Sequence, residues 1–283
     1  MPQDAGRGTQ APLTMRAKKR LGQHFLQPEW ADKLIDAIGP LPTDRFVEIG
    51  PGPGALTLRL APRVAHLTAV ELDRDMVAHL RPHVPGNVTL IEADFLDTPI
   101  DTLLPADGAV RVAGNLPYNV SSPILFRLLE AHVRTGRLVD ASLMLQREVA
   151  ERILAPPGSR TYGALSVFVQ QHADVRRLLT LPPGAFRPAP KVHSAVLRLG
   201  FRAPAAPVDD PELFETMVRT MFMQRRKTTA NALKGFAAGL GGDAAVVLRE
   251  AGIDPTRRPE TLQLDEMARL ADLFSSMKKR AVL

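Results

Sequence analysis

Strand-like and helix-like patterns alternate from about residue 29 to residue 154, and this alternation restricts the possible folds more than any other feature of the chain. Each strand-like run is short and apolar, and the stretches between them have the three-to-four-residue spacing of helices. Repeated strand–helix units predict an α/β fold with a doubly wound, mostly parallel sheet. The predicted strands are Arg45–Ile49, His66–Glu71, Val88–Glu92, Ala109–Gly114 and Ala141–Leu145, and the predicted helices are Pro53–Ala61, Arg74–Leu80, Ser122–Arg134 and Arg147–Leu154.

Two further strands are predicted before the pattern becomes helical. They are Val175–Leu181 and Ser194–Phe201, joined by a proline-rich loop, and they could form an antiparallel pair at the edge of what is then a seven-stranded sheet. Residues 202–210 (RAPAAPVDD) have the composition of a linker. After it, helices are predicted at Pro211–Met223, Arg226–Phe236, Ala244–Ala251 and Leu264–Met277.

This pattern predicts two domains. Residues 16–203 form the α/β domain, and residues 208–283 form a small all-α domain. Residues 1–15 are rich in Gly, Pro, Gln and Thr, which predicts a mobile N-terminus.

The composition excludes several classes of site. The chain has no cysteine, so disulfides, zinc–thiolate sites and cysteine nucleophiles are excluded, and we expect no metal centre. No apolar run reaches the roughly 18 residues of a membrane span. The N-terminus also lacks the apolar core of a secretory signal, so we expect a cytoplasmic protein without membrane contact.

Positive charge is segregated along the chain. The formal net charge is +6. Basic residues are in excess in the segments 1–20 and 174–202, whereas acidic residues are in excess between them. Such segregation favours a polyanionic partner such as nucleic acid. Charge alone is equally compatible with a soluble basic surface.

A glycine-rich turn follows the first predicted strand in FVEIGPGPGALT, residues 46–57. It is neither a dinucleotide fingerprint of the form GxGxxG nor a P-loop. Glycines allow a tight turn and close approach to a ligand, and a nearby helix N-terminus offers free N–H groups to an anionic group. Glu48 lies just before the turn. A tight strand-to-helix turn without any ligand is the alternative.

Two further acids end the next strands in the same register. Glu71 closes the second strand, where acids of doubly wound sites accept hydrogen bonds from ribose hydroxyls. Asp94 closes the third and is followed by Phe95, a pairing that suits the exocyclic amine and the ring of an adenine. The three strand ends together predict an adenosine-containing ligand, which could still be NAD. The stretch EIGPGPG, with Glu48, Gly50, Gly52 and Gly54, resembles the first motif, E-x-G-x-G-x-G, of the S-adenosylmethionine-dependent methyltransferases.

The stretch GNLPYN, residues 114–119, ends the fourth predicted strand and has no acid, base or nucleophile. An exocyclic adenine amine is a poor nucleophile, because its lone pair is delocalised into the ring. Neutral acceptors that hold both N–H groups would aim that lone pair at a methyl group. The Asn115 side chain and the Leu116 carbonyl can accept, Pro117 fixes the backbone, and Tyr118 offers a face for stacking. A simple Asn–Pro turn is the alternative.

Seven segments spread over the chain resemble the KsgA family of adenosine dimethyltransferases. They are RLGQHFLQPE (20–29), VEIGPGPGALT (47–57), VELDRDM (70–76), GNLPYNVSSP (114–123), MLQREVAERILAPPGSRTYGALSV (144–167), LPPGAFRPAPKVHSAVLRL (181–199) and QRRKTTANAL (224–233). The resemblance implies a Rossmann-like methyltransferase domain and a helical RNA-recognition domain. It also implies a monomeric enzyme that uses S-adenosylmethionine to dimethylate N6 of two adjacent adenosines. These lie in a hairpin near the 3′ end of 16S rRNA in the small (30S) ribosomal subunit or its precursor.

Three alternatives are retained. One is an erythromycin-type methylase of large-subunit rRNA, which shares the NLPY-type and proline-rich-loop motifs. Another is a ribosome-assembly factor whose binding matters more than its catalysis. The third is a NAD-binding oxidoreductase, for which no His or Lys is suitably placed.

The resemblance also implies roles for individual residues. Methyl-donor contacts fall on His24, Leu26, Gly50, Glu71, Asp94 and Asn115, and the motifs above add Glu48, Gly52 and Phe95. His24 replaces the commoner Asn of this family, and His193 replaces the usual Asp.

For the RNA, Phe186 is the candidate for a second face opposite Tyr118, although its spacing alone favours a core position. Arg187 and Lys191 flank it and could hold phosphates. Arg225, Arg226 and Lys227 form either a phosphate-binding patch or a solvated helix turn.

Overall fold

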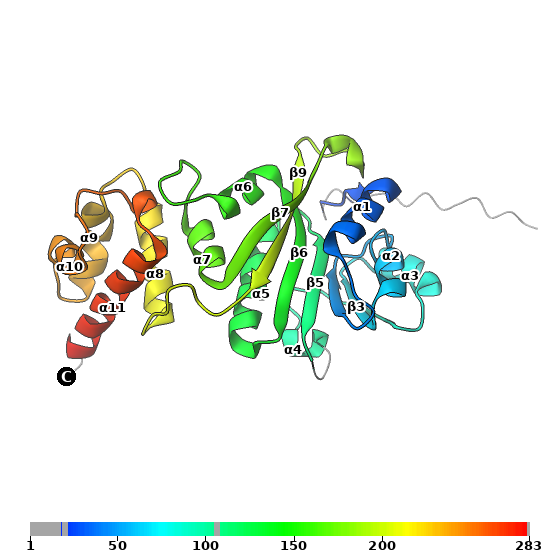
Figure 1. The fold of residues 1–283 in the computed structure, drawn as a ribbon, viewed down its shortest axis with the longest axis horizontal. Helices are drawn as coiled ribbons and strands as arrows, with labels where there is room; N and C mark the ends of the chain where they lie inside the picture. Colours follow the sequence, from blue (N-terminus) through cyan, green and yellow to red (C-terminus); the bar gives the residue numbers. More distant parts are fainter. Residues whose placement is uncertain (1–17, 19–21, 105–107, 282–283) are drawn as a thin grey trace, which may run out of the picture.

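The computed structural model describes residue 18, residues 22–104 and residues 108–281. The predicted mobile segment 1–15 lies outside the described residues. Figure 1 shows a central twisted sheet with helices on both faces and a group of helices, α8 to α11, beyond one edge of it.

The sheet has seven strands in the order β4-β3-β2-β5-β6-β9-β7. The first five in this order are parallel, and β9 runs antiparallel to both β6 and β7. This confirms the predicted doubly wound, mostly parallel sheet with an antiparallel pair at one edge. The strands are β2 (Arg45–Ile49), β3 (His66–Glu71), β4 (Val88–Glu92), β5 (Val110–Asn115), β6 (Leu138–Gln146), β7 (Ala173–Leu181) and β9 (Ser194–Phe201).

The helices of this part partly differ from the prediction. They are α1 (Pro28–Ile38), α2 (Thr57–Leu60), α3 (Arg74–Leu80), α4 (Ile100–Leu103), α5 (Ser121–Thr135), α6 (Arg147–Leu154) and α7 (Ala164–His172). Helix α2 is shorter than the predicted Pro53–Ala61, because Gly52 and Gly54 take positive φ angles and residues 52–56 form a turn. Helices α1, α4 and α7 are missing from the prediction. Helix α7 has no detectable helical period. Residues 165–169 are all buried, so the segment has no polar face to give a helical period.

Two short strands outside the main sheet were also not predicted. Strand β1 (Phe25–Leu26) pairs antiparallel with β8 (Phe186–Arg187), which places the N-terminal segment against the proline-rich loop. A two-residue strand carries no detectable alternation, so only the tertiary structure reveals it.

The C-terminal helices are α8 (Pro211–Met223), α9 (Thr229–Gly239), α10 (Ala244–Glu250) and α11 (Leu264–Ala281). Helix α9 begins three residues later than predicted. The Thr228 hydroxyl accepts from the Asn231 N–H and so caps the helix there, leaving Arg225–Lys227 in the preceding loop. Among the described residues, no helix is both long and apolar enough to cross a membrane.

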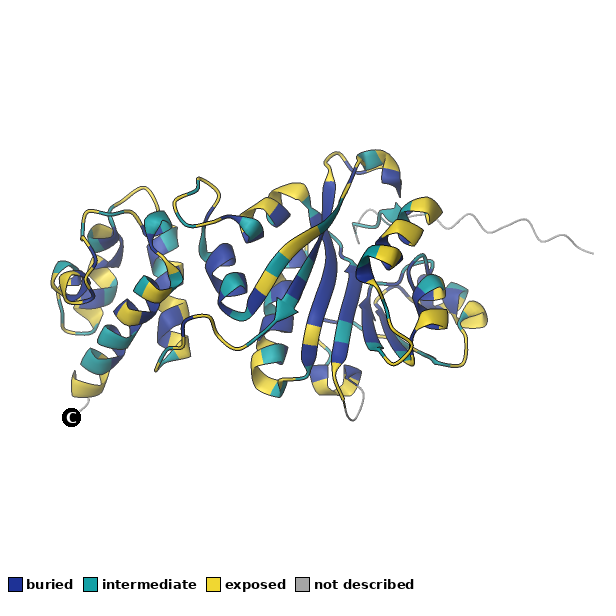
Figure 2. Ribbon diagram, in the orientation of Figure 1, coloured by how far each residue is buried: buried dark blue, intermediate teal, exposed yellow. Residues whose placement is uncertain are grey.

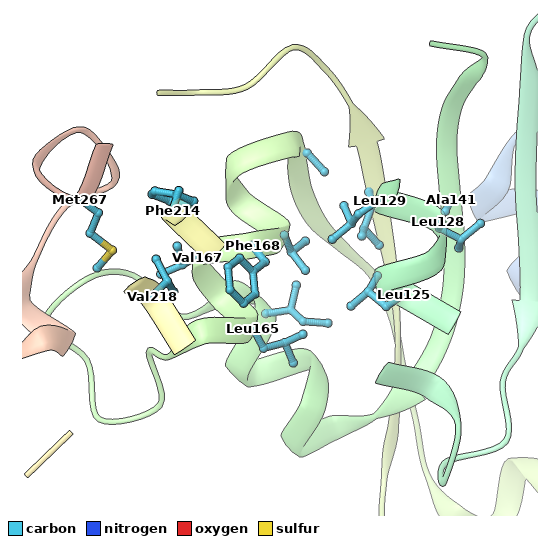
Figure 3. Close-up of a cluster of buried hydrophobic side chains, with 14 of the residues drawn as sticks. Leu125, Leu128, Leu129, Ala141, Leu165, Val167, Phe168, Phe214, Val218 and Met267 are labelled. Carbon is cyan, nitrogen blue, oxygen red and sulfur yellow. The ribbon is translucent and has the colours of Figure 1, made fainter. Parts of the chain in front are cut away.

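Buried residues fill the space between the sheet and its helices, and exposed residues cover the outer helix faces (Figure 2). One apolar cluster covers the α5–α7 side of the sheet and continues into the C-terminal helices. Figure 3 shows Phe214 and Val218 of α8 beside Val167 and Phe168 of α7. The two parts of the chain therefore share one hydrophobic core.

Candidate active site

A cavity opens at the carboxyl ends of β2, β3, β4 and β5, where ligands of doubly wound sheets bind. With its open mouth it encloses about 1220 Å³. All twelve residues that the sequence assigns to the methyl donor or to the NLPY motif line it: His24, Leu26, Glu48, Gly50, Gly52, Glu71, Asp94, Phe95, Asn115, Leu116, Pro117 and Tyr118. The fold thus gathers residues from four strand ends and the N-terminal segment around one space.

The glycine-rich turn forms one wall of the cavity. Gly50 and Gly52 have φ angles of 68° and 54°, a region that side chains with a Cβ rarely adopt. The Gly52 N–H donates to Glu71 Oε2 at 2.8 Å, which holds the turn against the end of β3. A Cβ at Gly50 would meet no atom within 4 Å, so this side of the turn faces open space.

The Glu71 carboxylate is fixed by backbone donors. Its second oxygen, Oε1, accepts from the Asp73 N–H at 2.8 Å. Burial raises the pKa of Glu71, and the N–H groups of Asp73 and Gly52 oppose that rise. A carboxylate oxygen can accept more than one hydrogen bond, so Glu71 retains capacity for ligand hydroxyls.

The other two acids differ in environment. Glu48 is 1% exposed, and burial raises its pKa to about 8, with a further contribution from the nearby charge of Glu71. Asp94 is only partly buried and accepts from the Leu96 N–H at 2.8 Å, which closes the turn after β4. Glu48 is therefore protonated at neutral pH and acts as part of the wall, whereas Asp94 can face a ligand.

The Asn115 amide has a defined orientation. Its Nδ2 donates to the carbonyl of His24 at 2.8 Å, and only the NH₂ group can face a carbonyl oxygen. The Oδ1 atom must then point the other way, as an acceptor. Gly114 is required just before it, because a Cβ there would lie 2.9 Å from the Ile49 carbonyl of the neighbouring strand.

Tyr118 is held at its far end and covered on one face. Its Oη lies 2.6 Å from Ser194 Oγ. The His24 ring stacks on it with centroids 5.6 Å apart and an interplanar angle of 27°. The Nδ1 atom of His24 lies 2.7 Å from the Pro188 carbonyl, so Nδ1 carries the proton and donates.

Phe186 does not line this cavity, and the expected Tyr118–base–Phe186 arrangement stays a prediction. Phe186 is 2% exposed and belongs to a second apolar cluster together with Leu26, its partner in the β1–β8 pair. Pairing with β1 turns the Phe186 side chain into the core, as its spacing alone favoured. The ring that faces Tyr118 is His24. Arg187 and Lys191 are exposed on the same loop.

The basic residues of the QRRKT segment lie away from the cavity. Arg225, Arg226 and Lys227 are exposed in the loop between α8 and α9. Arg225 and Arg226 line a second hollow, which we call the basic hollow, and Arg225 Nη2 donates to the Arg160 carbonyl at 2.6 Å. The residues that line the basic hollow are Gly158, Ser159, Arg160, Arg225, Arg226, Arg258 and Glu260.

Sequence reasoning missed Arg160 and Arg258, which belong to loops far apart in the chain. Two arginines of the basic segment 174–202 lie next to acidic residues of the same chain and not in the basic hollow. Arg198 lies 3.6 Å from Asp140, and Arg202 lies 2.8 Å from Asp174.

Other cavity residues were missed as well. Leu72 is 52% exposed although apolar, and it lines the cavity next to Glu71. Gln23 also lines the cavity and donates to Asp73 at 2.9 Å. Lys18, outside the cavity, lies 2.7 Å from Asp75 at the start of α3, so both contacts tie the N-terminal segment to the region after β3. A leucine directly after the acid that ends a strand is the sequence signal by which Leu72 could have been predicted to line the cavity.

Comparisons with known proteins identify the relatives of this chain. A family model described as ribosomal RNA adenine dimethylase matches residues 14–276. The chain is 48% identical over 265 residues to ribosomal RNA small subunit methyltransferase A of Syntrophotalea carbinolica, covering 93% of this chain and 98% of that protein. It is 45% identical over 264 residues to the protein of the same name from Geobacter metallireducens, covering 91% and 95%.

Solved structures show the same fold. A dimethyladenosine transferase from Plasmodium falciparum superposes with a TM-score of 0.76 at 24% identity, over 90% of this chain and 98% of that one. The 23S rRNA methyltransferase ErmE gives 0.63 at 23% identity, over 89% and 99%. The family match over nearly the whole chain and the close relatives show that this chain belongs to the ribosomal RNA adenine dimethylase family.

Proposed function

We propose that this enzyme transfers methyl groups from S-adenosylmethionine to N6 of two adjacent adenosines near the 3′ end of 16S rRNA, during assembly of the small ribosomal subunit. The observation that carries this proposal is the orientation of Asn115. Its amide oxygen is left as a neutral acceptor in the cavity that also contains the glycine turn and Tyr118. The relatives named small subunit methyltransferase support the choice of RNA.

The cavity fits the methyl donor. The open side of Gly50 gives room for the amino-acid end, and Glu71 is held ready to accept from ribose hydroxyls. Asp94, Phe95 and Leu72 supply an acceptor and apolar surface for the adenine. When bound, the donor supplies a methyl group on a positively charged sulfur.

The chain's own residues prepare the acceptor amine. In this proposal the Asn115 Oδ1 and the Leu116 carbonyl accept from the two N6–H groups and direct the lone pair at the methyl carbon. Positive charge that develops on N6 then meets dipoles that are already oriented. Tyr118 stacks on the extruded base, and His24 must move from its present position to admit it.

RNA binding is assigned to surfaces outside the cavity. Arg187 and Lys191 lie on the loop beside His24, and the basic hollow lies near the C-terminal helices. Guanidinium groups suit phosphates because their planar N–H donors bind two oxygens at once. We propose that a single copy of the enzyme docks on the small subunit through these surfaces.

The test is mass spectrometry of small-subunit rRNA after reaction with isotope-labelled donor. Wild-type enzyme should place two methyl groups on each of two neighbouring adenosines. Asn115→Ala should lower turnover by about 10²–10³-fold, the effect of losing one oriented polar group in comparable sites. Its affinity for the donor should change little. Asn231→Ala, an exposed change on α9, is the matched control and should behave as wild type. Turnover of Asn115→Ala near the wild-type rate would contradict the proposed role, and methylation of large-subunit RNA alone would contradict the proposed substrate.

A further inference from the structure

We propose that Ser194 is a positioning residue for the methyl transfer, because its hydroxyl holds the Tyr118 ring where the target adenine stacks. The inference rests on the proposed function. Ser194 belongs to β9, and none of the described residues of this strand lines the cavity. Ser194 therefore acts only through Tyr118.

Ser194 is a fixed point in the sheet. It is the first residue of β9, it is fully buried, and it stands in register with Gln146 of β6 and Leu181 of β7. Strands on both sides thus restrain its backbone. Its Cα cannot shift without disturbing two antiparallel pairs, so its Oγ is confined to the few rotamers of a fixed backbone.

Tyr118, in contrast, lies in a loop after β5, where a side chain has more freedom. Its carbonyl accepts from Ser121 Oγ at 3.1 Å, and its Oη meets Ser194 Oγ at 2.6 Å. With both ends held, the ring cannot swing about χ1. A stacking surface that is already in place avoids the loss of side-chain freedom that binding would otherwise require.

The position of His24 shows that this ring face is usable. A flat imidazole already packs on Tyr118 at 5.6 Å, in the way a base would. Without the hydrogen bond to Ser194, the Tyr118 ring would no longer have a fixed orientation. This loss of orientation should weaken the productive binding of the RNA substrate. It should not change the affinity for the methyl donor, whose proposed contacts are on other strand ends.

Steady-state kinetics can separate this role from a purely structural one. Ser194→Ala should lower kcat/KM for small-subunit rRNA about three- to tenfold, the range expected for one neutral hydrogen bond, with an unchanged Kd for S-adenosylmethionine. Ser142→Ala is the control, since Ser142 is a buried β6 serine whose Oγ has no hydrogen-bond partner among the described residues. It should leave kcat/KM unchanged.

A double-mutant cycle identifies the partner. Tyr118→Phe removes the same hydrogen bond, so the double variant should lose no more than either single variant. Additive losses, or no loss in Ser194→Ala, would overturn the proposal. If wild-type enzyme failed to methylate rRNA adenosines at all, the proposed function would fail instead.

An NMR readout does not depend on activity. The chain has only two tyrosines, Tyr118 and Tyr162, so the Tyr162→Phe variant leaves one ring to observe. In isotope-labelled protein, Ser194→Ala should shift the Tyr118 ζ-carbon resonance, and Ser142→Ala should not. Identical Tyr118 spectra with and without Ser194→Ala would show that the hydroxyl does not hold the ring.

Discussion

At the scale of single residues, Glu48 is the most unusual group in the cavity wall. It is 1% exposed and lies in β2, which is buried from Phe46 to Ile49, directly before the glycine turn. Burial raises its pKa from 4.5 to about 8. Burial also raises the pKa of the nearby Glu71, but the backbone N–H groups of Asp73 and Gly52 oppose that rise, so the two acids of one wall differ in how far burial raises their pKa.

This difference predicts a pH dependence of stability. Between pH 4.5 and about 8, folded Glu48 holds a proton that the unfolded chain has lost. The stabilisation is therefore complete at low pH and is lost as the pH rises toward 8, by about 1.4 kcal/mol per pH unit. Urea unfolding from pH 5.5 to 7.5 should show this slope in wild-type protein relative to Glu48→Gln.

Glu92→Gln is the control for this measurement, because Glu92 is exposed at the end of β4. Its unfolding free energy should follow that of wild type at each pH. Parallel curves for wild type and Glu48→Gln would mean that Glu48 titrates normally.

At the scale of elements, the N-cap residue of α9 determines where the loop between α8 and α9 ends. Because Thr228 starts α9, Arg225, Arg226 and Lys227 remain in a loop, and the loops after α6 and α10 bring Arg160 and Arg258 close to them. The basic hollow is thus built from three connections and not from one helix face.

Its proposed role predicts a weaker salt dependence once the loop is neutralised. Phosphate contacts release counterions, and each contact adds roughly 0.7–0.9 to the slope of log K against log salt. Changing Arg225, Arg226 and Lys227 together to Gln should lower that slope by about 2–3 for binding to small-subunit RNA. Fluorescence anisotropy at several salt concentrations measures it.

The matched control removes the same charge elsewhere, by changing the exposed Arg63, Arg81 and Arg134 to Gln. Its slope should equal that of wild type. Equal slopes for both triple variants and wild type would place the RNA away from the loop between α8 and α9.

At the scale of the whole molecule, the C-terminal helices and the α/β part are joined more closely than a linker sequence suggests. Phe214 and Val218 pack against α7, and the Arg219 guanidinium lies 5.3 Å and 5.1 Å from the rings of Phe126 and Phe168. Near residue 206, the side chain of Gln171 hydrogen-bonds the linker backbone. A shared core of this kind couples the unfolding of both parts.

We therefore expect one cooperative transition in calorimetry. Phe214→Ala lies at the junction, and Phe236→Ala lies within the C-terminal helices, where Phe236 packs against Phe274. Both changes should lower the temperature of that single transition. Because Phe214 is buried, its change should lower the free energy of unfolding by about 3–5 kcal/mol. Val133→Ala, at a side chain that is 62% exposed, should change little. Two separate transitions, with Phe236→Ala shifting only one of them, would show that the parts unfold independently.

The sequence by itself determined the features that depend on neighbouring residues. Strand and helix periods, the glycine turn and the acids at strand ends are local patterns, and parallel strands necessarily bring their carboxyl ends to one edge. For that reason the sequence alone predicts that Glu48, Glu71, Asp94 and Asn115 lie together. They do line one cavity.

Only the tertiary structure decided which distant segments meet. The β1–β8 pair turned Phe186 into the core and brought His24 over Tyr118. The insertion of β9 between β6 and β7 placed Ser194 under the Tyr118 hydroxyl. Three loops assembled the basic hollow. Such contacts leave no periodic trace in the sequence, because they depend on packing between residues that are far apart along the chain.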